Sequence, residues 1–285
     1  MCRLVAYLGQ DILLEDVLVK PTDSLVKQSL HAQESSVLTN GDGFGIGWYV
    51  PQISRGPAIF LSIFPAWNDQ NLLHLTAKIK SSNFFGHVRA ASIGGVNNYN
   101  CHPFNYKQWM FMHNGTIGDF LAIKRQIRNL LDDDIYNWIK GETDSEHFFA
   151  LFLQLAKGKN LSNLVAVAAI LVDTIAKIKQ LLAQLGKHQT SFYNICLTDG
   201  RRIVASRYCT NKNSAPETMY YLAGRYFWSE KDYLQEIELP AQKCVMIASE
   251  KLTDFSSQQW YPVAANHLLL VDRDLSIQMQ EISLD

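Results

Sequence analysis

The order of strand-like and helix-like stretches is the feature that most constrains the fold of this chain. Strand patterns dominate up to His113, helical periodicity prevails from Gly118 to Leu185, and strand patterns return from Ser191 to Glu281. Central helices between two strand-rich ends predict an α+β layered fold whose ends come together in space. Because no Pro/Ser-rich linker, repeat or low-complexity stretch interrupts the sequence, we expect one domain spanning residues 2–285.

Local signals predict several boundaries within this order. Thr22-Asp23-Ser24 and Thr143-Asp144-Ser145-Glu146 have helix N-cap chemistry, and the second has the spacing of a capping box. Asp199-Gly200 predicts a hairpin turn. The strand that starts at Trp109 is expected to stop at Asn114-Gly115, a turn dipeptide. A long helix or a helix pair is expected over 161–185, within a helical insert near 156–188.

Composition excludes several classes of function. The formal net charge is −1, which gives no general attraction to nucleic acid or to an anionic membrane. The most apolar later stretch, Leu164–Val172, is shorter than the roughly 20 residues that span a bilayer. The five cysteines are odd in number and lack C-x-x-C spacing, which argues against a disulfide framework or a zinc knuckle. No signal peptide is evident, so we expect a cytoplasmic protein with reduced thiols.

The glycine-rich segment 40–50 was compared with the glycine pattern of dinucleotide-binding loops. Its alternating glycines do not satisfy G-x-G-x-x-G, and the segment leads into a strand rather than from a strand into a helix. Glycines that alternate with apolar residues suit a strand closely approached by another backbone or a ligand. No cofactor is predicted.

Cys2 directly follows the initiator methionine and opens an apolar, strand-like run. Removal of Met1 would give Cys2 both a thiol and a free α-amine. Unperturbed, the amine has a pKa of about 7.7–8.0 and the thiol about 8.5, so the amine can accept the thiol proton near neutral pH. The alternative is that Cys2 is a small buried hydrophobe, which is common for cysteine.

Four polar clusters are expected at strand ends or helix starts, where a rigid element positions functional groups: Cys2, His87–Ser92, His113–Gly115 and Thr143–Glu146. Each also has a structural interpretation. Arg89 could serve a surface ion pair, His113–Gly115 only a turn, and Thr143–Glu146 only an N-cap.

Together, however, these clusters resemble a family. Cys2 after Met1, G-H-V-R-A-A-S, N-C-H-P-F, H-N-G and T-D-S-E, in this order, are similar to the class II glutamine amidotransferase domain. The resemblance runs from residue 2 to about residue 155 and resumes at Ala248-Ser249-Glu250-Lys251-Leu252-Thr253. It implies an αββα sandwich of the N-terminal-nucleophile hydrolase type.

The resemblance also implies roles for individual residues. Cys2 would attack the γ-carbonyl of a glutamine-like substrate, with its own α-amine as general base, and form a γ-glutamyl thioester. Asn114 and the Gly115 backbone N–H would form the oxyanion hole. Arg89, supported by Ser92, would bind the substrate α-carboxylate. Asp144 would pair with the α-ammonium group.

The sequence also departs from the sugar-phosphate-forming members of the family. They have Trp after the binding arginine and His after the following Thr, where this chain has Ala90 and Ile93, so the leaving-group side of the pocket is expected to differ. His87 and His102 are interpreted as hydrogen-bonding structural residues. Because H-x-x-x-H and H-x-H spacings are lacking, no metal site is predicted.

After the strands that complete the sandwich, no stretch is long enough for a fused acceptor domain. Two stand-alone groups of the family remain: one similar to the γ-glutamyl hydrolase of ergothioneine biosynthesis, and one similar to the amidotransferase-like subunit of a glutathione-degrading complex. The 65–72 segment and the helical insert favour the second. We therefore expect hydrolysis of a small γ-glutamyl amide. The alternatives are a partner-dependent glutaminase subunit that passes ammonia to a separate enzyme, and a non-catalytic glutamate-sensing subunit.

Overall fold

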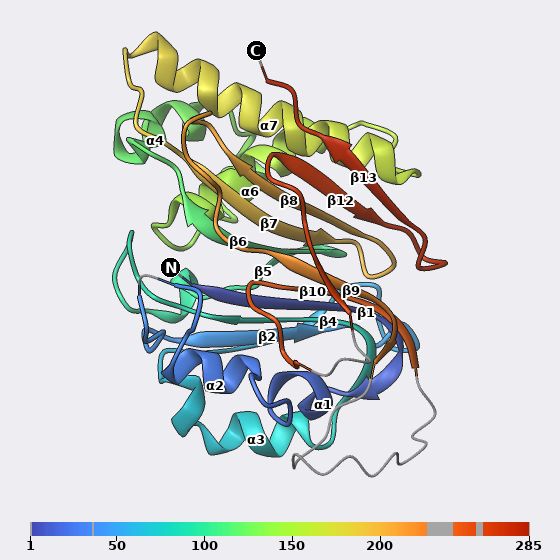
Figure 1. Ribbon diagram of the computed structural model, residues 1–285. Coiled ribbons are helices and arrows are strands. Elements are labelled where there is room, and N and C mark those ends of the chain that lie inside the picture. The colour runs from blue at the N-terminus through green and yellow to red at the C-terminus, as the bar shows by residue number, and fades with distance from the viewer. Residues whose placement is uncertain (1, 36, 227–241, 255–258, 285) are drawn as a thin grey trace.

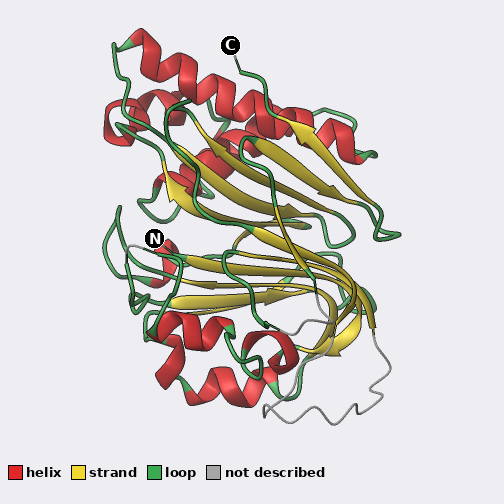
Figure 2. Cartoon of the chain, viewed as in Figure 1, coloured by secondary structure: helices red, strands yellow, loops and turns green. Residues whose placement is uncertain are grey.

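Two antiparallel β-sheets lie face to face, and helices cover the outer side of each sheet (Figure 1, Figure 2). The computed structural model describes residues 2–35, 37–226, 242–254 and 259–284. The layer order is therefore helices, sheet, sheet, helices. The α+β, four-layer αββα sandwich predicted for this chain is confirmed.

The first sheet is built from both ends of the chain. Its strands, in spatial order, are β11 (Trp260–Pro262), β9 (Tyr220–Tyr226), β10 (Gln242–Ala248), β1 (Arg3–Leu13), β4 (Lys80–Val88), β2 (Phe44–Trp48) and β3 (Ala58–Ser62). The helices α1 (Glu15–Leu18), α2 (Leu25–Leu30) and α3 (Gln70–Thr76) cover its outer face (Figure 1). Because β10 pairs with β1, the two ends of the chain meet in this sheet, as the sequence predicts.

The second sheet carries the longer helices. Its spatial order is β13 (Ile277–Glu281), β12 (His267–Val271), β8 (Ile203–Cys209), β7 (Phe192–Thr198), β6 (Trp109–Thr116) and β5 (Phe104–Tyr106). The helices between β6 and β7 in the chain are α4 (Phe120–Asn129), α5 (Asp133–Tyr136), α6 (Asp144–Ala156) and α7 (Leu164–Gln184). Within the described residues, none of the helices is both long enough and apolar enough to cross a membrane.

The first part of strand β1, from Arg3 to Leu8, is buried on both faces, which explains its almost continuous apolar sequence. Leu4, Ala6 and Leu8 belong to the apolar cluster between the two sheets. Val5 and Tyr7 belong to the cluster that β1 shares with α1 and α2. This alternation holds the start of β1 in the middle of the sandwich, so a residue at its N-terminal end is rigidly positioned.

The predicted helix and turn signals are largely confirmed. Ser24 caps α2 by accepting the Lys27 N–H, and Thr143 caps α6 by accepting the Glu146 N–H. Gly200 forms the β7–β8 turn with a φ of +88°. Only half of the capping box forms, because the Glu146 carboxylate accepts the backbone N–H groups of Lys140 and Gly141 instead.

Two features of the second sheet differ from the expectations. The prediction that the strand stops at Asn114-Gly115 is wrong, because β6 continues to Thr116 and these residues pair with Asn194 and Tyr193 of β7. A neighbouring strand therefore overrides the local turn preference of Asn-Gly. Sequence analysis also missed β5, which follows the loop at Cys101 and His102. The segment expected as a helix or a helix pair is the single helix α7.

Candidate active site

Cys2 lies at the start of β1, beside the end of β4. Antiparallel pairing aligns Arg3 with Val88, which brings the thiol to the residue after Arg89. The Ala90 N–H donates to Cys2 Sγ at 3.3 Å, and Sγ lies 3.4 Å from the Ala90 carbonyl oxygen. Two of the predicted clusters, at positions 2 and 87–92, are therefore adjacent in space.

The environment of Cys2 controls its protonation. Burial raises the pKa of the thiol above its ordinary value, while the Ala90 hydrogen bond and the charges of Arg89 and Arg3 oppose this shift only in part. A raised pKa means that the resting group is a thiol rather than a thiolate near neutral pH. A nucleophilic role for Cys2 therefore requires a base nearby.

Arg3 fixes the backbone of Cys2 and was not predicted as a site residue. Its side chain is fully buried, and Nε donates to the Cys2 carbonyl oxygen at 2.7 Å. Nη1 donates to Glu250 Oε1 at 2.9 Å, and Glu250 also accepts the backbone N–H groups of Gln33 and Glu34. The only sequence signal was the resemblance of Ala248–Thr253 to a family element, which gave Glu250 no role.

Asn114 connects β6 to the start of β1 through a serine. Its Nδ2 donates to Ser249 Oγ at 3.4 Å, and the same oxygen accepts the Leu4 N–H at 3.1 Å. Asn114 is fully buried, and its Oδ1 has no hydrogen-bond partner among the described residues. This contact links the two sheets two residues from Cys2.

Gly115 follows Asn114 in β6 at a position that excludes a side chain. A Cβ atom there would overlap the backbone carbonyl of Phe192 on β7 and Nε2 of His113. Because a strand carbonyl cannot move aside cheaply, glycine is required by packing as well as by the predicted use of its N–H group. The packing requirement alone would explain glycine here.

Arg89 is 3% exposed and lies within the loop that follows β4. Its guanidinium donates to the carbonyl oxygens of Ile93 at 3.0 Å, Gly94 at 3.1 Å and Gly95 at 3.1 Å. Three such bonds use three of the five N–H groups of an arginine. No described carboxylate forms an ion pair with Arg89, so its charge is not cancelled.

Asp144 is the first residue of α6 and is 3% exposed. Its Oδ2 accepts the Ile117 N–H at 2.7 Å, just beyond β6, and Oδ1 accepts the Ser145 N–H at 2.9 Å. Backbone donors and the helix N-terminus therefore stabilise the carboxylate without a cationic side chain. Asp144 and Arg89 form a buried anion and a buried cation, each held by backbone.

His113 supports this arrangement rather than taking part in proton transfer with Cys2. Its Nε2 lies 2.8 Å from the Phe192 carbonyl oxygen, which can only accept, so Nε2 carries the proton. Nδ1 then accepts from Ser145 Oγ at 2.9 Å. Burial lowers the pKa of His113, which keeps the ring neutral.

Ser92 is separated from the other predicted site residues. It is exposed and makes no hydrogen bond with a described residue of the site. It lies on the rim of a groove of about 380 Å³, whose lining comprises Ser92, Ile93, Thr116, Ile117, Asp119, Phe120, Leu121, Ala122 and Gln189. Two residues that line this groove also bind the buried charges: Ile117 donates its N–H to Asp144, and the Ile93 carbonyl oxygen accepts from Arg89. Ser92 therefore lies at the mouth of the candidate site.

The interpretation of His102 as a hydrogen-bonding residue is wrong, whereas His87 interacts with the backbone of His113. The two rings lie 4.3 Å apart between centroids with their planes tilted by 31°, and neither ring nitrogen of His102 has a hydrogen-bond partner among the described residues. Burial lowers the pKa of His87 to about 3 and lowers that of His102 as well. Both rings therefore behave as neutral packing groups. The residues that the structure describes contain no group of three or more His, Cys, Asp or Glu suited to a metal ion.

A comparison with protein families identifies the family of this chain. A sequence model of the class II glutamine amidotransferases matches residues 13–283. The chain belongs to this family. The match begins after Cys2, so the assignment of the nucleophile does not rest on it.

Two relatives give the family match more detail. The Saccharomyces cerevisiae protein named "Probable glutamine amidotransferase DUG3" is 36% identical over 295 residues, which cover 96% of this chain and 82% of the yeast protein. The γ-glutamyl-hercynylcysteine sulfoxide hydrolase of Mycolicibacterium smegmatis is 31% identical over 120 residues, 41% of this chain and 52% of that protein. Both relatives bear enzyme names that refer to glutamine or to a γ-glutamyl compound.

Solved structures support the fold. A Silicibacter pomeroyi protein described as a "glutamine aminotransferase class-II domain protein" has a TM-score of 0.66 at 24% identity, over 99% of this chain and 100% of the other. The allosteric regulatory enzyme of purine biosynthesis has a TM-score of 0.61 at 13% identity, over 99% of this chain and 49% of that enzyme. The sandwich is thus of the N-terminal-nucleophile hydrolase type, as the resemblance implied.

Proposed function

We propose that this amidotransferase hydrolyses a γ-glutamyl amide through a thioester on Cys2. The observation that carries the proposal is the position of the thiol. Cys2 Sγ contacts the Ala90 backbone, one residue after a buried arginine whose charge no described carboxylate cancels. A nucleophile beside an anion-binding group matches the needs of a substrate with a γ-carbonyl at one end and an α-carboxylate at the other.

The α-amine of Cys2 is the base in this proposal. The thiol is protonated at rest because burial raises its pKa, and no described histidine forms a hydrogen bond with it. An amine on the same residue lies within reach without any further side chain. The amine is free only after removal of Met1, a residue that lies outside the described part of the chain.

The reaction then balances in two stages. The amine takes the thiol proton, Cys2 Sγ attacks the γ-carbonyl, and the developing oxyanion is stabilised by Asn114 Nδ2 and the Gly115 N–H. Collapse breaks the C–N bond, and the amine returns the proton to the leaving group. Water next attacks the thioester carbon, which releases glutamate and restores the thiol.

The two buried charges select the glutamyl end. Its α-carboxylate and α-ammonium form a zwitterion, and Arg89 and Asp144 offer one cation and one anion. Each is stabilised by backbone groups, so neither charge must be taken from an existing ion pair when the substrate binds. Ser92, at the mouth of the groove, supports the carboxylate.

The experiment measures glutamate release by protein whose mass shows that Met1 is absent, with glutamine and glutathione as substrates. Release from glutathione indicates a γ-glutamyl hydrolase. Release from glutamine alone, with ammonia, indicates a glutaminase half that serves a separate acceptor enzyme. Cys2→Ala is expected to reduce either release by at least about 10³-fold, as expected for loss of the nucleophile.

Cys209→Ser is the matched control for that variant. Cys209 is buried in the second sheet, and its Sγ contacts the carbonyl oxygens of Asn211 and Ser214, which a serine hydroxyl can also reach. It should retain activity and form a glutamyl adduct at Cys2 detectable by mass. Undiminished glutamate release by Cys2→Ala would contradict the mechanism. A folded, Met1-free protein inactive on both substrates would favour a glutamate-sensing subunit.

A further inference from the structure

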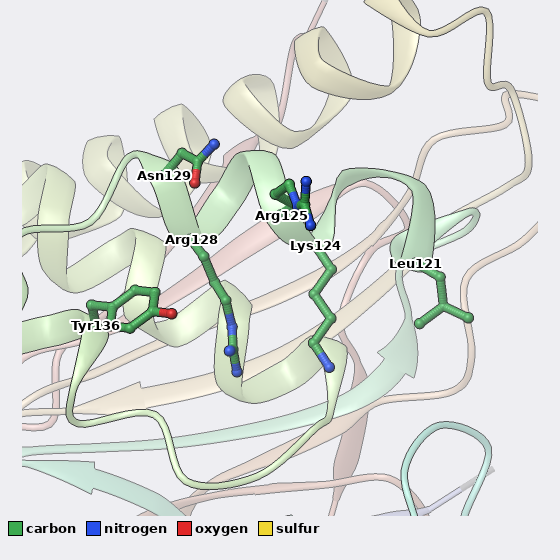
Figure 3. Close-up of a pocket in the computed structure, with 6 residues that line it drawn as sticks. All are labelled: Leu121, Lys124, Arg125, Arg128, Asn129 and Tyr136. Carbon is green, nitrogen blue, oxygen red and sulfur yellow. The ribbon is translucent and has the colours of Figure 1, made fainter.

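The outer face of α4 contains a second hollow, which the proposed reaction does not use. It has a volume of about 590 Å³, and its lining comprises Leu121, Lys124, Arg125, Arg128, Asn129 and Tyr136 (Figure 3). Three of these side chains are cationic and none is acidic. Lys124, Arg125 and Arg128 form no ion pair with any residue that the structure describes.

Arg128 is already oriented for a ligand. Its Nε donates to His147 Nε2 at 2.9 Å, and the Tyr136 ring centroid lies 5.7 Å from its guanidinium carbon. The two terminal nitrogens have no acceptor among the described residues. Lys124 extends in the same direction as Arg128, one helical turn away (Figure 3). An immobilised planar fork with free terminal N–H groups is the geometry that binds a carboxylate or a phosphate through two oxygens.

The group that holds Arg128 is neutral, which leaves its charge available. His147 Nδ1 lies 2.7 Å from the Thr143 carbonyl oxygen, so Nδ1 donates and Nε2 accepts. Burial lowers the pKa of His147 to about 4, so the ring carries no charge at neutral pH. Glu146 is the acid that interacts electrostatically with Lys124 and Arg128, and both its oxygens accept backbone N–H groups.

The hollow adjoins the groove at the mouth of the candidate active site. Leu121 lines both, and Phe120 and Ala122 of the same helix line the groove. A ligand in the groove could therefore extend along α4 towards the cations. The volume also leaves room for an organic anion rather than a bare ion.

We propose that the hollow formed by Lys124, Arg125 and Arg128 is a binding site for a small oxyanion, a carboxylate or a phosphate. Two sources fit this chemistry. One is the distal carboxylate of a γ-glutamyl peptide bound in the groove, and this source rests on the proposed function. The other is a free anion, whose binding does not depend on the reaction.

The first arm of the test measures binding of inorganic phosphate by calorimetry and needs no activity. Lys124→Gln combined with Arg125→Gln should weaken binding at least about tenfold, because two cations near the anion are lost. Arg128→Lys keeps the charge but loses the fork, and should weaken binding by about fivefold. Lys78→Gln combined with Lys80→Gln removes two exposed lysines, one just after α3 and one at the start of β4, and should leave binding unchanged.

The second arm compares KM for glutathione, for its C-terminal amide and for glutamine in the same variants. A rise in KM for glutathione alone assigns the site to the substrate carboxylate. Weakened phosphate binding with unchanged KM values assigns it to a free anion. The proposal is wrong if phosphate binds all variants equally or not at all and the KM values also stay unchanged. Loss of activity on every substrate would instead count against the proposed function, and the phosphate arm would then decide this site alone.

Discussion

Two buried arginines near Cys2 have opposite surroundings. Arg3 donates to the Glu250 carboxylate at 2.9 Å, whereas Arg89 donates only to the backbone carbonyls of Ile93, Gly94 and Gly95. A carboxylate cancels the charge of a guanidinium, and neutral carbonyl oxygens do not. Burial alone therefore does not distinguish a structural arginine from a ligand-binding one. The acceptors around it do.

The acids show the same contrast. Glu250 accepts from Arg3 and from two backbone N–H groups, so its charge is matched within the protein. Asp144 accepts from the Ile117 and Ser145 N–H groups and forms no ion pair with a described residue. Arg89 and Asp144 are thus two buried charges that no described ion pair cancels and that have capacity left for a ligand. Arg3 and Glu250 hold the nucleophile's backbone.

The largest effect is expected for Arg3→Met. It leaves the buried Glu250 carboxylate without its cation, which typically costs about 3–5 kcal/mol of stability. It also removes the donor that holds the Cys2 carbonyl oxygen. Urea unfolding should show the loss in the free energy of unfolding, and kcat for glutamate release should fall while KM changes little.

Arg3→Met combined with Glu250→Gln separates the two effects. A neutral glutamine removes the uncompensated buried charge and keeps one oxygen, which accepts one of the Gln33 and Glu34 N–H groups, so the double variant should be more stable than Arg3→Met alone. Its kcat should stay low, because the Cys2 carbonyl is still not held. Recovery of kcat together with stability would show that Arg3 acts only on folding.

Arg89→Lys is expected to have the next largest effect, on the substrate rather than on the fold. An ammonium group has three N–H donors, and the three carbonyls that now accept from Arg89 would use all of them. The loop should stay folded, but no donor would remain for the α-carboxylate. We expect kcat/KM to fall about 10²-fold, mainly through KM.

Thermal unfolding provides the check on that interpretation. Arg89→Lys should melt close to the unaltered chain, in contrast to Arg3→Met. Equal losses of stability in the two variants would mean that Arg89, like Arg3, is a structural residue. The contrast between carboxylate and carbonyl acceptors would then have no functional meaning.

The sequence predicted the elements better than it predicted their contacts. The strand, helix, strand order, the Thr143 cap and the Asp199-Gly200 hairpin depend on local patterns, and all are confirmed. The extension of β6 through Asn114 and Gly115 depends on pairing with β7, some 80 residues later, and could not be seen locally.

The candidate site likewise consists of residues that local motifs predict and of contacts that local motifs do not predict. Cys2, Arg89 and Asp144 could be chosen from motifs that resemble a family, although their roles remain predictions. The Arg3–Glu250 pair joins residues 247 positions apart, and the bond from Arg128 to His147 joins two helices. Such contacts are set by packing and leave no spacing signal in the sequence. Ser92 shows the converse, since its motif position does not bring it against the other site groups.

The smallest expected effect concerns Arg128, whose acceptor is a neutral imidazole. The pKa of His147 is lowered to about 4 by burial, whereas a histidine in an unfolded chain titrates near about 6.5. Between these two pKa values, the unfolded state binds one proton more at this position than the folded state does. The contribution of this residue to the free energy of unfolding is therefore complete above the unfolded pKa and decreases as the pH falls towards the folded pKa. The slope for one proton is about 1.4 kcal/mol per pH unit.

His147→Gln keeps a donor for Thr143 and an acceptor for Arg128, and should reduce the steepness of the decline by that amount in urea unfolding across this range. His188→Gln, at an exposed position, should leave it unchanged. Identical slopes in the two variants would mean that His147 is charged in the folded protein, and Arg128 could not then donate to it.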